Sequence, residues 1–305
     1  VAKIILPAES RRKMTCCCLL ASVIHLSVIQ DQIRALAFSA AKDAGRHMLK
    51  CTNSEGVNSA MTKLDAKDLV TAVDTECQQI VEDRVLDVFP THMLLGEESV
   101  QPGIEAAIRS ARQLRQAEWA WVIDPIDGTT NFVAGLPMSV VSIGIAHFGT
   151  PVGAAIYDPF RDEIFEAWRG CGATLNGHSI RVSQTAKLAE AVVCAPCPHN
   201  PPSMHPALRS INAVLPQARS VRILGSGVLN FAWIACGRVS AYWEHELACW
   251  DTIAGGLVVQ EAGGTVTDTD GTPWDLTTTS VLASNGGIHD ELRGLLERAD
   301  AIATD

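Results

Sequence analysis

Residues 119–131, Trp-Ala-Trp-Val-Ile-Asp-Pro-Ile-Asp-Gly-Thr-Thr-Asn, place two carboxylates, Asp124 and Asp127, at the mouth of a turn. The alternation of large apolar residues before Asp124 predicts a half-buried strand, and we expect Pro125 to end it because proline cannot continue a ladder. Gly128 permits a tight turn, and the Thr-Thr-Asn after it is typical of a helix start, where free N–H groups bind phosphate. The stretch therefore predicts a binding site for a hard cation beside a binding site for phosphate.

Two further acidic segments stand at the ends of predicted elements. Residues 96–99, Gly-Glu-Glu-Ser, follow an apolar strand, and Asp251 begins an apolar, small-residue helix. If residues 96–99 are extended, Glu97 faces the site and Glu98 the opposite side. A lone Asp-x-x-Asp-Gly is more often an ordinary turn with solvated carboxylates. Acids at the ends of several separate elements instead favour a convergent magnesium site.

The composition narrows the class of protein. A chain of 305 residues that is 47% hydrophobic buries a large core. Its formal charge of −10 argues against binding to duplex nucleic acid, which needs a basic surface. Ten cysteines in this length, three of them adjacent at 16–18, do not predict a disulfide framework. We expect a reducing compartment and a cytoplasmic location.

Residues 1–30 form an N-terminal extension of unknown role. The basic residues 11–13 and the apolar run 16–28 have the layout of a signal peptide or anchor, but His25 and Ser27 interrupt the run, and a clear cleavage site is missing. The run is also too short to predict a membrane span. Membrane association is not expected, organelle targeting or anchoring stays open, and the extension is expected to be irrelevant to catalysis.

Apolar periodicity predicts helices at 31–50 and 75–89, and strands at 93–95, 120–123, 140–146, 152–157, 163–166 and 172–175. After residue 186, predicted strands at 191–194, 220–224 and 241–243 alternate with helices at 206–214, at 228–237 and after Asp251. Residues 31–185 are therefore expected to form an α+β half and residues 186–305 an α/β half.

Two other motifs suggest different chemistry. Cys194 and Cys197 with His199 resemble part of a zinc site, but a second cysteine pair at suitable spacing is missing, so a structural loop is favoured. Residues 225–227, Gly-Ser-Gly, lie between a predicted strand and helix with Glu244 downstream, as in a dinucleotide-binding fingerprint. The third glycine of that fingerprint is absent, and a nucleotide cofactor is the less favoured alternative.

Four segments, in order, resemble the inositol monophosphatase family of Mg²⁺-dependent, lithium-sensitive phosphatases, over roughly residues 35–290. They are Lys63 with residues 68–74, residues 96–99, residues 121–132, and residues 250–264. The resemblance implies a layered α-β-α-β-α sandwich of the sugar phosphatase type. It also implies a homodimer that acts on a small phosphate monoester, with residues 31–185 as the metal-binding half and residues 186–305 as a half that carries substrate-binding residues.

By the same resemblance, two to three Mg²⁺ ions bind each subunit. The first would be held by Glu97, Asp124 and the backbone carbonyl of Ile126. Asp124 would bridge to a second ion, which Asp127 and Asp251 also hold. Glu97 would help to hold a third ion through water, which makes it a catalytic residue as well as a ligand.

The resemblance also assigns the groups around the phosphate. Thr129, oriented by Asp74, would position and deprotonate the attacking water. The backbone amides of Gly128, Thr129 and Thr130 would hold phosphate oxygens. Lys63 stands where the family has a lysine near the phosphate or third metal, although a solvated lysine is an alternative.

The remaining substrate contacts come from the second half. The amides of Gly225, Ser226 and Gly227 would face the substrate hydroxyls, and Gly227 replaces the alanine more usual in the family. Glu244 would accept hydrogen bonds from the cyclitol, beside Asp251.

The expected reaction is hydrolysis of myo-inositol 1-phosphate to inositol and phosphate, in inositol metabolism and phosphatidylinositol signalling. The same metal core serves relatives that hydrolyse adenosine 3′,5′-bisphosphate, fructose 1,6-bisphosphate, histidinol phosphate or galactose 1-phosphate. A non-catalytic regulator that binds inositol phosphate or lithium is the alternative from a different class.

Overall fold

The computed structural model describes residues 8–52, 61–62, 69–198 and 201–302. For residues 8–27, 61–62, 69–70 and 201 it describes the backbone alone. The predictions for Lys63 and for Asp68 lie outside the described residues.

A seven-stranded sheet forms the centre of the first half. In spatial order its strands are β3 (Met93–Gly96), β4 (Trp119–Asp127), β5 (Val140–His147), β6 (Thr150–Asp158), β7 (Glu163–Trp168), β8 (Gly172–Leu175) and β9 (His178–Ser179). β3 pairs in parallel with β4, and every later pair is antiparallel. The predicted strands of this region are thus confirmed, with β9 added.

The second half contains a five-stranded mixed sheet. Its strands, in spatial order, are β11 (Ser220–Arg222), β10 (Val192–Cys194), β12 (Ala241–Glu244), β14 (Val281–Ser284) and β13 (Thr265–Thr267). β10 pairs in parallel with β11 and β12, whereas β14 is antiparallel to both of its neighbours. The α/β alternation is confirmed, but β13 and β14 were not predicted, because short apolar runs carry little periodicity.

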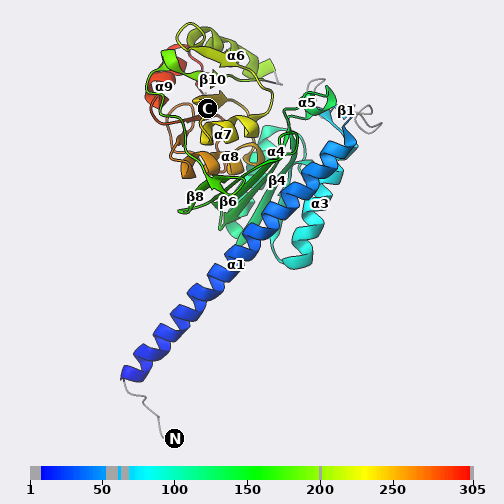
Figure 1. The fold of residues 1–305 in the computed structure, drawn as a ribbon, viewed down its shortest axis with the longest axis vertical. Helices are drawn as coiled ribbons and strands as arrows, with labels where there is room; N and C mark the ends of the chain where they lie inside the picture. The colour runs from blue at the N-terminus through cyan, green and yellow to red at the C-terminus, as the bar shows by residue number, and fades with distance from the viewer. Residues whose placement is uncertain (1–7, 53–60, 63–68, 199–200, 303–305) are drawn as a thin grey trace, which may run out of the picture.

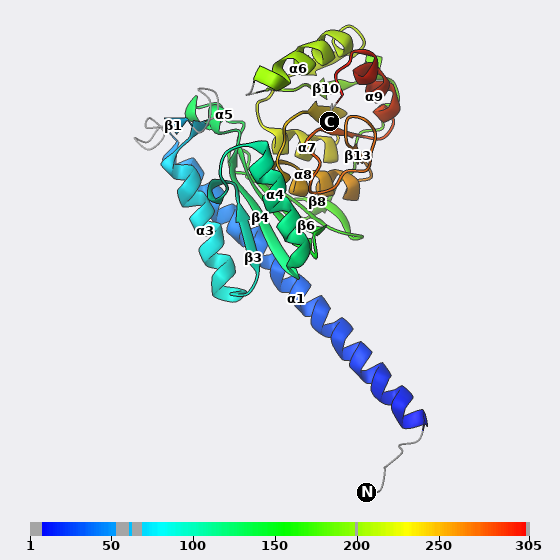
Figure 2. The same cartoon turned by 180° about the vertical axis from the view of Figure 1, so that it is seen from behind.

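Helices cover both sheets and separate them. α1 (Ala8–Cys51) and α3 (Ala72–Val88) lie on one face of the seven-stranded sheet, α7 (Gly227–Ala235) and α8 (Cys249–Glu261) lie between the sheets, and α6 (Pro201–Val214) and α9 (His289–Arg298) cover the far side (Figures 1 and 2). The smaller elements are α4 (Ile104–Gln113), α5 (Thr129–Val133), the ribbon of β1 (Met61–Thr62) and β2 (Leu69–Val70), and the 3₁₀ turns Glu97–Ser99, Leu114–Gln116 and Leu188–Glu190. The α-β-α-β-α sandwich is confirmed.

Burial explains which residues form these layers. The outer helices bury Ile33 of α1 and Val81 of α3 against Trp121 and Ile143 of the first sheet. A fully buried aliphatic side chain stabilises the fold by roughly 1.5–3 kcal/mol relative to exposure. α8 is buried from Thr252 to Val259, which explains why its sequence is apolar on every side.

The prediction that Pro125 ends its strand is wrong. β4 continues to Asp127, because Asp124 pairs with Ser142 and Asp127 with Val140, which leaves one extra residue on the β4 side. Such a β-bulge tolerates a proline, whose missing N–H would otherwise break the ladder.

Several helix boundaries also differ from those predicted, and α6 begins at Pro201, before residue 206. α3 begins at Ala72, before residue 75, because Thr71 and Asp74 form a reciprocal capping box. α1 begins at Ala8, before residue 31, and its amino-terminal part extends away from the layered body (Figure 1). Within the described residues, no helix has both the length and the apolar character needed to cross a membrane.

Candidate active site

A pocket of about 480 Å³ opens between the two halves. Its lining comes from the turn after β3, the end of β4, the start of α5, the amino ends of α7 and α8, and the end of β12. Twelve predicted site residues line it: Glu97, Asp124, Ile126, Asp127, Gly128, Thr129, Thr130, Gly225, Ser226, Gly227, Glu244 and Asp251. Segments far apart in the chain therefore meet at one cavity.

Three carboxylates meet inside this pocket. One oxygen atom from each of Asp124, Asp127 and Asp251 lies within 4.8 Å of the other two. Asp124 and Asp127 are three residues apart and would point to opposite faces of a regular strand, but the extra residue of the β4 bulge brings both to the pocket side. Asp251 arrives from the first turn of α8 and accepts the Ala248 N–H at 2.6 Å.

Asp127 also joins the two halves. Its carboxylate accepts hydrogen bonds from the Ser226 hydroxyl and from the amides of Gly227, at 3.1 Å, and Val228, at 2.9 Å. These donors form the amino end of α7, where a negative charge is favoured. Burial raises the pKa of Asp127 to about 6, against the lowering effect of these hydrogen bonds. The Gly227 amide, predicted to face substrate hydroxyls, donates to Asp127 here.

Thr129 and Asp74 form a hydrogen-bonded pair beside the carboxylates. The Thr129 hydroxyl oxygen is 3.1 Å from Asp74 Oδ1 and 3.0 Å from the Ile126 carbonyl oxygen, so its one proton is directed to either acceptor. Asp74 also accepts the Thr71 N–H at 2.8 Å and the Thr71 hydroxyl at 2.6 Å. Burial raises the pKa of Asp74, whereas the Thr71 and Thr129 hydrogen bonds lower it. Asp74 lies behind Thr129 and does not line the pocket.

The segment with Glu97 is a 3₁₀ turn. The prediction that Glu98 faces away is wrong, because the turn is not extended and both glutamates line the pocket. Gln78 of α3 holds the turn: its side-chain oxygen accepts the Glu98 N–H at 2.9 Å. A Cβ atom on Gly96 would lie 2.2 Å from the Gln78 side chain, so any larger residue here would displace Gln78 from the turn. Glu97 is not part of the tight group that Asp124, Asp127 and Asp251 form.

Sequence reasoning missed Gln78. It is a buried polar residue one helical turn after Asp74. Its spacing of four residues from Asp74 places it on the same face of the helix, and this spacing could have indicated its role at the site.

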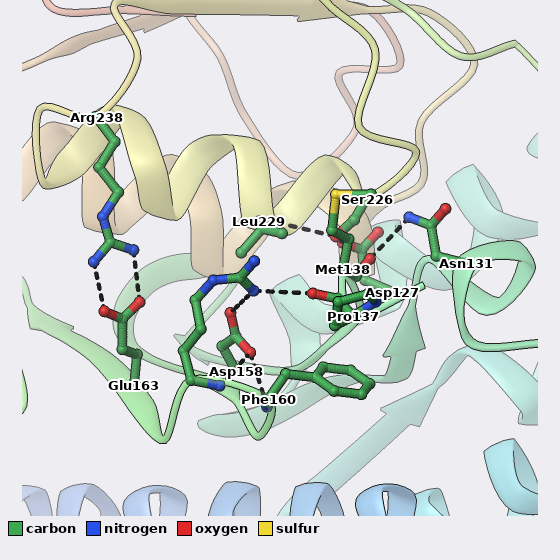
Figure 3. Close-up of polar contacts among 11 residues, drawn as sticks. Asp127, Asn131, Pro137, Met138, Asp158, Phe160, Glu163, Ser226, Leu229 and Arg238 are labelled. Carbon is green, nitrogen blue, oxygen red and sulfur yellow. Dashed lines mark hydrogen bonds and ion pairs between the residues drawn. The ribbon is translucent and has the colours of Figure 1, made fainter. Parts of the chain in front are cut away.

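Gly128 and Asn131 fix the start of α5. Gly128 has φ +88°, and a Cβ atom there would lie 3.0 Å from the Met138 carbonyl oxygen. The Asn131 amide donates to that same oxygen at 2.9 Å (Figure 3). It also donates to the Leu224 carbonyl oxygen at 2.7 Å. The loop that precedes Gly225 is thereby tied to the helix that carries Thr129.

Glu244 is buried at the end of β12. It accepts the backbone N–H groups of Cys197, at 2.7 Å, and His245, at 3.1 Å. Burial raises its pKa to about 7 despite these hydrogen bonds. Burial also lowers the pKa of His245 to about 4, so this neighbour is neutral at physiological pH. The backbone N–H of Cys197 therefore holds Glu244 at the pocket, a contact that the Cys-x-x-Cys motif did not predict.

The fold and the pocket define a layered α/β protein with a candidate divalent-cation site between its two halves. The profile of the inositol monophosphatase family matches residues 29–301. The chain belongs to the inositol monophosphatase family.

Individual relatives agree with this assignment. The chain is 39% identical over 236 residues to inositol monophosphatase 2 of Solanum lycopersicum, covering 76% of this chain and 87% of that protein. It is 37% identical over 253 residues to the Nus factor SuhB of Pseudomonas aeruginosa, covering 82% and 90%. The crystal structure of the extragenic suppressor protein suhB of Bartonella henselae superposes with a TM-score of 0.79 at 31% identity, covering 88% of this chain and 99% of that one. Family and names support a phosphatase of the inositol monophosphatase type.

Proposed function

We propose that this protein is a Mg²⁺-dependent phosphatase that hydrolyses myo-inositol 1-phosphate to inositol and phosphate. The observation behind the proposal is the convergence of Asp124, Asp127 and Asp251 within 4.8 Å, beside the hydrogen-bonded Thr129 and Asp74. The carboxylates that would bind metal and the hydroxyl that would position water therefore share one part of the pocket.

The donor set fits magnesium. The three aspartates offer only hard oxygen atoms, as Mg²⁺ prefers, and the pocket leaves room for water and a substrate phosphate. Glu97 and the Ile126 carbonyl would complete the set for two to three ions. Bound Mg²⁺ would neutralise developing charge and make a bound water more acidic.

Thr129 would position the attacking water. If the Ile126 carbonyl is engaged as a ligand, the Thr129 proton is directed to Asp74, and the hydroxyl lone pair is left to accept a proton from water. The water proton would pass to the Thr129 oxygen as the Thr129 proton passes to Asp74. The raised pKa of Asp74 favours this transfer.

The start of α5 would hold the phosphate, and the second half would hold the rest of the substrate. The amides of Gly128, Thr129 and Thr130 provide donors for phosphate oxygens. The Glu244 carboxylate, already at the pocket wall, would accept hydrogen bonds from substrate hydroxyls together with the Gly225–Gly227 segment.

The alternatives differ in the substrate or in the class of protein. Histidinol phosphate, galactose 1-phosphate, fructose 1,6-bisphosphate and 3′(2′),5′-bisphosphate nucleotides would use the same metal ligands. A non-catalytic regulator would need the carboxylates for binding but not the Thr129–Asp74 hydrogen bond, and the presence of that pair supports catalysis.

A phosphate-release assay across these substrates tests the proposal. We expect the highest kcat/KM for inositol 1-phosphate, no activity in chelator, and recovery with Mg²⁺. Li⁺ should inhibit uncompetitively at tens of millimolar or below, an order-of-magnitude limit for a monovalent ion among hard oxygen ligands. The absence of phosphate release from every substrate would favour the regulator. Light scattering would test the expected homodimer.

A further inference from the structure

A second group of metal-ligating side chains lies in the outer helix layer. His47 and Cys51 are one turn apart at the carboxyl end of α1, and Glu76 lies near the amino end of α3. The two helices pack side by side, as both views show (Figures 1 and 2). One ligand atom from each residue lies within 4.8 Å of the other two, and none of the three residues lines the active-site pocket.

The distances suit a tetrahedral ion. His47 Nε2 is 3.6 Å from Cys51 Sγ, and the nitrogen and sulfur ligands of a tetrahedral Zn²⁺ stand about 3.5 Å apart. His47 Nε2 is 2.7 Å from Glu76 Oε2, where the two groups share a proton. An ion in place of that proton would lengthen this separation by less than about 1 Å. The Glu76 side chain is 55% exposed, so it has freedom to make this adjustment.

We propose that His47, Cys51 and Glu76 form a Zn²⁺ site separate from the aspartate group of the pocket. A thiolate, an imidazole and a carboxylate are ligands that zinc accepts together, whereas magnesium binds oxygen and rarely uses such a set. On binding, the Cys51 thiol proton is released to solvent. The proton between His47 Nε2 and Glu76 moves to Nδ1 of a neutral ring or, from an imidazolium, to solvent, so that neutral His47 binds through Nε2, and a water molecule takes the fourth position.

The ion would connect two parts of the fold. It joins the last turn of α1 to the first turns of α3 and so closes the chain between residues 51 and 76. Asp74, two residues before Glu76, holds Thr129. The site therefore stabilises the helix pair that supports the active site from behind.

Cobalt spectroscopy of the full-length chain tests the proposal. Saturating Mg²⁺ occupies the aspartate group, a non-thiol reductant keeps the cysteines reduced, and Co²⁺ is then added. A thiolate-to-cobalt band in the near ultraviolet reports a cysteine ligand specifically. We expect this band in the wild type, its loss in Cys51→Ser, and its removal by Zn²⁺. His47→Gln should weaken Co²⁺ binding by at least about 10-fold. Loss of a residue that only hydrogen-bonds to a metal ligand already lowers metal affinity by about this factor, and His47 would be a ligand itself.

Two cysteine variants serve as matched controls. Cys197 lines the active-site pocket and Cys171 is exposed in the turn between β7 and β8, so Cys197→Ser and Cys171→Ser should keep the band. Circular dichroism checks that each variant is folded. A wild type without the band, a band that survives Cys51→Ser, or one that disappears in Cys197→Ser would overturn the site. Because the measurement needs no turnover, its outcome is independent of the proposed phosphatase activity.

Discussion

The two walls of the pocket hold their acids differently. On the wall from the first half, Asp124 and Asp127 lie on a bulged strand, and Asp74, behind this wall, accepts three hydrogen bonds. On the wall from the second half, Glu244 accepts two backbone N–H groups, and its pKa is raised to about 7. Asp251 comes from the second half but lies with the first-wall aspartates. We infer that the first wall binds the metal ions and positions the attacking water, and that the second wall binds the substrate hydroxyls and selects the substrate.

Removing a metal ligand should have the largest effect. Asp124→Asn and Asp251→Asn, one from each half, should each lower kcat by at least ~10³-fold for every substrate, because both ions stabilise the transition state. Steady-state phosphate release with Mg²⁺ measures this. Asp275→Asn, at an exposed aspartate outside the pocket, is the matched control and should keep full activity. Activity that persists in chelator or in both pocket variants would refute a shared metal site.

Changing the second wall alone should alter substrate choice. Glu244→Gln keeps the size of the side chain but removes a charge-assisted acceptor. Inositol 1-phosphate should therefore lose on the order of 1.5–3 kcal/mol of transition-state binding. Glycerol 2-phosphate, which lacks the cyclitol hydroxyls, should lose little. The ratio of the two kcat/KM values measures the effect. Equal losses for both substrates would show that the two walls are not divided in this way.

The pKa of Glu244 predicts a pH-dependent stability difference. Since burial raises it from 4.5 to about 7, the folded chain keeps a proton that the unfolded chain releases. Its contribution is fully present below the unfolded pKa and is lost as pH rises through the folded pKa. From about pH 5 to about pH 8, the metal-free wild type should lose on the order of 1–3 kcal/mol of unfolding free energy relative to Glu244→Gln. Urea titrations measure this. If the unfolding free energies of the wild type and Glu244→Gln change in parallel with pH, the raised pKa of the buried Glu244 carboxylate is contradicted.

Deletion of residues 1–28 should have no effect on kcat, KM or unfolding free energy. Ile29 is half-buried and Ile33 fully buried against the first sheet, so the packed part of α1 stays intact. A deletion that continues through Ala40 removes Ile33 and Leu36 and is the matched control, since it should destabilise the fold by several kcal/mol. If the short deletion also prevents folding, the extension contributes to the core.

The acidic residues were predictable because their chemistry is local. A carboxylate after an apolar strand, or at the first turn of an apolar helix, can be recognised without knowing its neighbours. The twelve predicted site residues named above all line the one pocket. The bulge was not predictable, because it depends on the pairing of Asp124 with Ser142 and of Asp127 with Val140 on another strand. The role of Gln78 likewise depends on a turn 20 residues away.

The sequence by itself determined the ligand types, the alternation of strands and helices, and the family, since each of these depends on short segments and their order. Only the tertiary structure decided which acids meet. Asp251 reaches Asp124 and Asp127 because α8 packs between two sheets, and Glu76 reaches His47 because α3 packs beside α1. Burial by distant segments also set the pKa of Glu244, and that burial is a property of the packed layers and of no short stretch of the chain.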